Sequence, residues 1–149
     1  MGIALTLHML AAVIWVGGMF FAYMALRPAA AAVLEPPQRL PLWVATFQRF
    51  FPWVWGAIIL LPATGYWMIY FVFEDVAAYV HIMQGIGIAM IAIFLHVFFA
   101  PYQRLGRAVS AADWPEAAKQ LNQIRQLIFI NLNLGLITVV VATGGAYWS

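Results

Sequence analysis

The chain has 149 residues, of which 66% are hydrophobic and only 8% are charged, and this composition excludes a water-soluble globular domain of ordinary type. The absence of cysteine excludes disulfides, thiolate metal sites and cysteine nucleophiles, so imidazole and thioether are the soft ligands available. The net charge of +2 comes from arginines scattered between apolar runs and predicts no nucleic-acid surface. We expect an integral membrane protein in contact with the lipid bilayer.

Four apolar runs are long enough to cross a hydrocarbon core about 30 Å thick. The predicted transmembrane helices cover residues 3–27, 48–73, 78–101 and 124–148, with cytoplasmic loops at 28–47 and 102–123. No charged residue precedes Arg27, whereas a signal peptide places positive charge ahead of its apolar region, so the first helix is expected to remain in the mature protein. The fold class predicted is an all-α membrane protein, a single antiparallel bundle of four transmembrane helices.

The distribution of charge predicts the orientation of the bundle. The connection after the first helix, with its flanks, carries Arg27, Arg39 and Arg49 against Glu35. The connection after the third helix likewise carries Arg104, Arg107, Lys119 and Arg125 against Asp113 and Glu116, whereas the connection between the second and third helices carries only Glu74 and Asp75. By the positive-inside rule, the N and C termini then lie on the periplasmic side of a bacterial inner membrane.

Proline and capping residues mark the helix ends. The alanine run after Arg27 is expected to prolong the first helix until Glu35-Pro36-Pro37 interrupts it. Pro62 is expected to kink the second helix, and the third is expected to end near Pro101. Asp113 and Glu116 form a capping-box pattern from which one helix could run unbroken into the fourth span. The aromatic entry to the second helix, from Phe47 to Trp55, is typical of a headgroup boundary.

Ionisable residues inside a membrane are costly, so the histidines are the first candidates for function. His8 and His81 lie on parallel helices, each within about two turns of the periplasmic boundary at 1.5 Å per residue. Two imidazoles at one depth suit a heme b held between them as axial ligands. Small residues nearby, among them Gly17, Gly18 and Gly85, would leave room for the macrocycle, although tight helix packing explains each of them equally well.

The same two histidines also suit copper, since imidazole and thioether are ligands that Cu(I) prefers. Met9 and Met83 stand beside them in sequence, but on a helix they point about 100° and about 200° away from the imidazoles. We therefore expect the imidazoles, and not these methionines, to form any copper site.

The third histidine, His96, lies about 22 Å deeper than His81 along the helix axis. It is a further candidate metal ligand, but it belongs to the cytoplasmic half of the bundle. A hydrogen bond to Asn131 or Asn133 of the fourth helix is the simpler expectation for it.

Three segments carry a resemblance to a known family: His8 followed by Trp15-Val16-Gly17-Gly18, HVFFAPYQRL from His96, and IRQLIFINLNLG ending at Gly135. Together they resemble the copper-resistance D (CopD-like) family of small bacterial inner-membrane proteins. The first segment is also similar, more distantly, to the four-helix membrane protoporphyrinogen oxidases, which bind heme. The family resemblance implies copper uptake or tolerance, with His8 first among the ligands and Trp15, Gly17 and Gly18 as packing support.

Three functions follow from these patterns. The leading one is a heme b protein that uses His8 and His81 for electron transfer or redox chemistry with a membrane or periplasmic partner, which would include a heme-dependent oxidoreductase. The alternatives are a copper transport or tolerance protein using the same histidines, and a structural membrane subunit without a cofactor. A hydrolase is not expected, because no serine, histidine and carboxylate share one depth. The helix face of small residues at Gly17 and Gly18 is also typical of a homodimer contact.

Overall fold

The structure is a computed structural model that describes residues 1–148, and these residues contain helices and turns but no β-strand. The α-helices are α1 (Gly2–Phe21), α2 (Arg27–Val33), α3 (Pro36–Phe71), α4 (Ala78–Phe99), α5 (Pro101–Ser110) and α6 (Trp114–Gly144). A π-helical turn, Ala22–Leu26, joins α1 to α2, and a 3₁₀ turn, Gly145–Tyr147, follows α6. The predicted all-α class is confirmed.

Four continuous helical stretches are long and apolar enough to cross a membrane: Gly2–Val33, Pro36–Phe71, Ala78–Ser110 and Trp114–Tyr147. Large apolar side chains cover their outer surfaces, as at Ile3, Ile59 and Ile88. Such a surface is unusual on a soluble monomer but is expected where lipid is the solvent. The predicted four-helix membrane protein is therefore confirmed.

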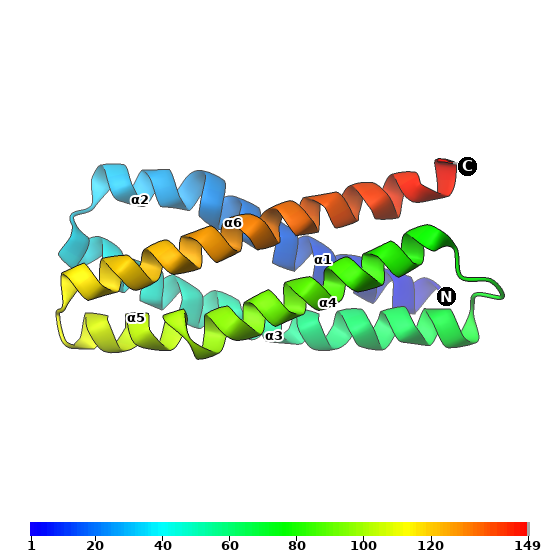
Figure 1. Cartoon of the computed structure of the whole chain (residues 1–149), viewed down its shortest axis with the longest axis horizontal. Coiled ribbons are helices and arrows are strands. Elements are labelled where there is room, and N and C mark those ends of the chain that lie inside the picture. The colour runs from blue at the N-terminus through cyan, green and yellow to red at the C-terminus, as the bar shows by residue number, and fades with distance from the viewer. Residues whose placement is uncertain (149) are drawn as a thin grey trace.

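The helices form two antiparallel pairs that lie against each other (Figure 1). Helix α1 packs mainly on α3, whereas α4 and α5 pack mainly on α6. Both termini lie at the same end of the bundle, beside the turn between α3 and α4, and the other two connections lie at the opposite end. This arrangement agrees with an even number of spans; that the termini face the periplasm stays a prediction.

The helices extend well beyond the predicted spans, so the loops expected at 28–47 and 102–123 are mostly helical. Alanine favours helix in α2, and Pro36 sits in the first turn of α3, where a missing N–H costs nothing. Prolines at 41, 52 and 62 do not end α3, because one stripe of its side chains is buried over most of its length. Tertiary packing outweighs local propensity here.

Proline also explains the two irregularities in the other spans. Pro28 lacks the N–H that would bond to the carbonyl four residues before it, and the π-helical turn lies directly there. Ala100 precedes Pro101 and leaves the helical region, with φ −119° and ψ −89°, so α4 ends and α5 begins a new helix. The predicted end near Pro101 is confirmed.

The turn between α5 and α6 closes with a Schellman motif. Asp113 N–H donates to Ala108 O at 2.9 Å, and Ala112 N–H donates to Val109 O at 3.1 Å. Ala112 occupies the left-handed position, φ 53°, that usually holds glycine. Asp113 then caps α6 by accepting from Glu116 N–H at 3.3 Å, which confirms the predicted helix start.

The core of the bundle is aromatic. Phe47 and Phe51 of α3 are buried and stack at 4.9 Å between ring centroids, and Phe51 meets Phe94 of α4 edge to face. The headgroup-boundary interpretation is therefore wrong for Phe47 and Phe51, which fill the space between the two helix pairs. It suits Trp53, whose side chain is 65% exposed.

Candidate metal-binding site

His8 lies on the face of α1 that packs against α3. The buried residues of α1 are Ala11, Trp15 and Met19, which repeat every four positions, and His8 precedes the first of them by three. Its side chain is half-buried, and it lies near the N-terminal end of α1. The helix stripe therefore turns this imidazole toward a neighbouring helix rather than toward lipid.

The partner of His8 is the hydroxyl of Thr64 on α3, and this contact determines which ring nitrogen carries the proton. His8 Nδ1 lies 2.9 Å from Thr64 Oγ1. The single hydroxyl hydrogen of Thr64 is donated to Leu60 O, 2.6 Å away, so Oγ1 accepts from His8 Nδ1–H. The imidazole then has an unprotonated Nε2, which is the form that binds a metal ion.

Glycine at position 65 allows the imidazole to approach α3 closely. A Cβ built at Gly65 would lie 3.3 Å from His8 Cε1 and 3.7 Å from Nδ1. Contacts near 3.3 Å are tight for a real side chain, so a larger residue would push the ring away from Thr64. Thr64 and Gly65 together therefore define the position of His8.

Met68 is a buried methionine on the face of α3 that carries Thr64. It follows Thr64 by four residues, about 6 Å along the helix axis, and its side chain is buried. Sequence reasoning missed it, because only the methionines adjacent to the histidines were considered. The spacing of four between Thr64 and Met68 is the signal that could have identified it. Met9, in contrast, is exposed, in agreement with its predicted direction.

His81 lies on the other helix pair and is exposed. Its Nδ1 is 3.2 Å from Gln84 Oε1, one turn further along α4, so its hydrogen bond is local to its own helix. Helix α4 packs on α6, whereas His8 faces α3. His8 and His81 are thus directed to different surroundings.

His96 is exposed, and the predicted hydrogen bond to Asn131 or Asn133 is wrong. Asn131 Nδ2 donates to Met90 O at 3.3 Å, and Asn133 Nδ2 donates to Phe129 O at 2.7 Å. Both amide groups therefore donate to backbone carbonyls, and His96 lies exposed at the surface of the bundle.

The remaining predicted site residues differ in their surroundings. Trp15 is only 2% exposed and meets Phe94 edge to face, so it packs in the core. Gly18 lies directly against the ring of Phe50. A Cβ built at Gly17 or Gly85 would have no atom within 4 Å, so neither glycine is closely packed against another helix within the described residues.

No group of three or more His, Asp or Glu side chains converges within residues 1–148. On the face of α3 that His8 contacts, the methionine is Met68. Thioether and imidazole select a soft ion such as Cu(I) over hard cations, which take oxygen ligands.

Comparison with known proteins gives one family. The family model described as "Copper resistance protein D" matches residues 44–144, from α3 to the end of α6. The match includes Thr64, Gly65 and Met68, and His8 lies ahead of it. No curated protein and no solved structure matches the chain. The matched segment covers more than half of the sequence, and the chain therefore belongs to the copper resistance protein D family, whose membrane proteins are linked to copper resistance.

Proposed function

We propose that this protein contributes to copper tolerance by binding Cu(I) at His8 on the periplasmic side of the bacterial inner membrane. The observation that carries the proposal is the hydrogen-bonded series His8 Nδ1–H to Thr64 Oγ1 and Thr64 O–H to Leu60 O. It holds one tautomer of the imidazole and leaves Nε2 to accept a metal ion. Metal-binding histidines commonly donate their other N–H in this way.

The buried thioether of Met68 is the second ligand in this proposal. It lies on the same face of α3 as Thr64. Because its thioether is buried, binding of strongly hydrated hard cations at this position is disfavoured. Copper is therefore the bound cargo, and the site holds it near the membrane surface. The family assignment supports the same metal.

Heme b between His8 and His81 is the competing proposal. It requires both imidazoles to face one cavity, whereas His81 is exposed and bonded to Gln84, and His8 is engaged by Thr64. The open surroundings of Gly17 and Gly85 add no enclosed space for a porphyrin. These placements favour copper over heme.

The test is an anaerobic competition titration of the detergent-purified full chain against a chromophoric Cu(I) chelator. We expect one Cu(I) per chain, loss of binding in His8→Ala and weakening in Met68→Leu. His96→Ala is the matched control. This histidine is exposed and lies further toward the cytoplasmic end of the bundle, so the variant should bind Cu(I) as wild type does. Equal binding by wild type and His8→Ala would refute the proposal.

An absorption spectrum of the same samples, oxidised and then dithionite-reduced, tests heme. Reduced α and β bands that vanish in both His8→Ala and His81→Ala would establish heme and overturn the copper proposal. A chain that binds neither copper nor heme would instead be a structural membrane subunit.

A further inference from the structure

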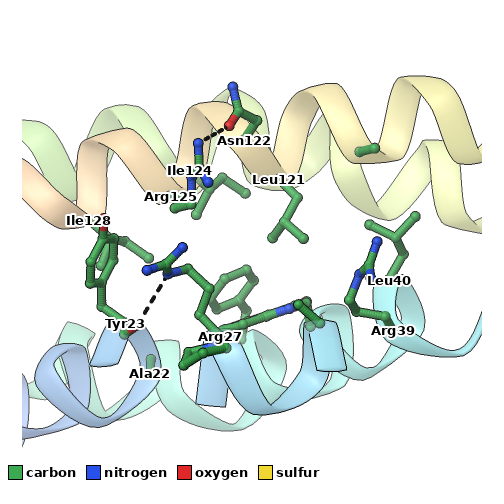
Figure 2. Close-up of a pocket in the computed structure, with 15 residues that line it drawn as sticks. Ala22, Tyr23, Arg27, Arg39, Leu40, Leu121, Asn122, Ile124, Arg125 and Ile128 are labelled. Carbon is green, nitrogen blue, oxygen red and sulfur yellow. Dashed lines mark hydrogen bonds between the residues drawn. The ribbon is translucent and has the colours of Figure 1, made fainter. Parts of the chain in front are cut away.

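A cavity lies at the end of the bundle opposite to His8, between the π-helical turn, α2, α3 and α6. It has a volume of about 240 Å³. Three arginines line it, Arg27, Arg39 and Arg125, together with Asn122. None of the described lining residues is acidic. Figure 2 shows Arg27 reaching from the α1–α2 segment toward α6, with Arg125 and Asn122 on the facing helix and Arg39 at the other side of the cavity.

Each guanidinium is anchored by one nitrogen and keeps others for a ligand. Arg27 Nε donates to Tyr23 O at 3.2 Å, and the guanidinium lies 4.4 Å from the centroid of the Tyr23 ring. Arg39 Nη1 donates to Leu34 O at 3.3 Å. Arg125 Nη2 donates to Asn122 Oδ1. Because a guanidinium has five N–H donors, most of the donors in the cavity remain available.

Three like charges around one cavity repel one another unless an anion lies among them. Ordinary snorkelling would send these side chains outward to water, yet Arg27 and Arg39 are half-buried and line the cavity. The fork of a guanidinium matches the oxygens of a phosphate group. The charge and the donor geometry thus suit a phosphate-bearing anion.

The walls and the position of the cavity indicate that the phosphate belongs to an amphiphile. Beside the arginines, the lining is apolar, with Leu40, Trp43 and Ile128 among its residues. Arg27 lies 19 residues after His8, about 28 Å along the helix, so the cavity falls near the opposite headgroup layer. Its volume is below the roughly 300–1,000 Å³ of pockets for drug-sized ligands, so it suits a headgroup better than a macrocycle.

We infer that this cavity binds the phosphate headgroup of an anionic phospholipid. Arg27 and Arg39 clamp the phosphate, Arg125 and Asn122 close it from α6, and the apolar wall contacts the adjoining glycerol and acyl segment. The bound lipid holds α2, α3 and α6 together at the end of the bundle where the two arginine-rich connections lie.

The experiment measures thermal unfolding and lipid retention of the full chain in a neutral detergent, by scanning fluorimetry and native mass spectrometry. Phosphatidylglycerol is compared with phosphatidylcholine of the same acyl chains, and with sodium phosphate at matched ionic strength. We expect phosphatidylglycerol to raise the melting temperature and phosphatidylcholine to have little effect. Arg27→Gln/Arg39→Gln should lower the affinity for phosphatidylglycerol at least about tenfold.

The matched control is Arg104→Gln/Arg107→Gln, which removes the same charge from the exposed face of α5 outside the cavity. It should keep the stabilisation by phosphatidylglycerol. A second variant, Ala118→Phe, keeps every arginine and fills the cavity from an exposed position on its lining, so it should lose the stabilisation without a general loss of folding.

The outcomes separate the sources of phosphate. Stabilisation by phosphatidylglycerol but not by sodium phosphate, lost in the cavity variants, supports the lipid. Stabilisation by sodium phosphate alone, also lost in those variants, overturns the lipid and leaves a site for free phosphate. Equal responses of the cavity variants and Arg104→Gln/Arg107→Gln, or equal effects of the two lipids, overturn the site itself.

Discussion

Replacing Thr64 by valine removes the acceptor for His8 Nδ1–H while keeping the shape of the side chain. Thr64 is only 8% exposed, so water does not readily replace the lost hydroxyl, and the N–H at the end of a 2.9 Å bond is left facing a methyl group. The imidazole is then free to carry its proton on Nε2, the nitrogen that should bind copper. Removal of such an orienting partner typically weakens metal binding about 10- to 100-fold, or about 1.4–2.7 kcal/mol.

The assay is the Cu(I) competition titration, run on Thr64→Val, Thr64→Ser and Thr138→Val. Thr138 donates to Leu134 O at 2.8 Å, the same bond within its helix that Thr64 makes to Leu60 O, and its variant should bind Cu(I) as wild type does. Thr64→Ser keeps a hydroxyl and should retain most of the affinity. If Thr64→Val binds as tightly as wild type while His8→Ala does not bind, the hydroxyl does not orient the ligand and the reasoning is refuted.

Three further predictions concern glycines and a turn. Gly65→Val should weaken Cu(I) binding in the same titration, because even a Cβ at this position would lie 3.3 Å from the His8 ring. Gly56→Val on the same helix has open space around it and should bind Cu(I) as wild type does. Equal effects of the two variants would contradict a role for the close approach of His8 to Gly65. Gly18→Ala should destabilise the bundle by about 1–3 kcal/mol in thermal unfolding, because its Cβ overlaps the Phe50 ring, while Gly17→Ala beside it should have no such cost. Ala112→Gly should stabilise the chain by about 1 kcal/mol, because glycine adopts the left-handed Schellman position without a Cβ penalty; a lower melting temperature would show that the turn is not the one described.

The sequence was sufficient to predict the number of transmembrane spans, their antiparallel order and several helix ends. These features depend on the length of apolar runs and on local chemistry, as in the capping of α6 by Asp113 and the break at Pro101. The depth of each histidine also follows from counting residues along a helix. His8 could therefore be singled out from the sequence alone.

The direction of each side chain around its helix could not be predicted in the same way. Lipid is as apolar as the bundle core, so α1 and α4 are apolar on all sides and show no polar face that would mark the outside. For that reason the sequence paired His8 with His81 by depth, whereas the hydrogen-bond partner of His8 is Thr64 on α3. The burial of Phe47 and Phe51 escaped prediction for the same cause.

The aromatic core has a consequence for access to the proposed copper site at His8. The rings of Trp15, Phe51 and Phe94 close the middle of the bundle, and the cavity beside them measures about 20 Å³, close to the space for one water molecule. An ion bound at the proposed His8 site would thus be separated from the opposite side of the bilayer by these rings. On this proposal the monomer would take up and release the ion on one side of the membrane, and passage across it would require these rings to part.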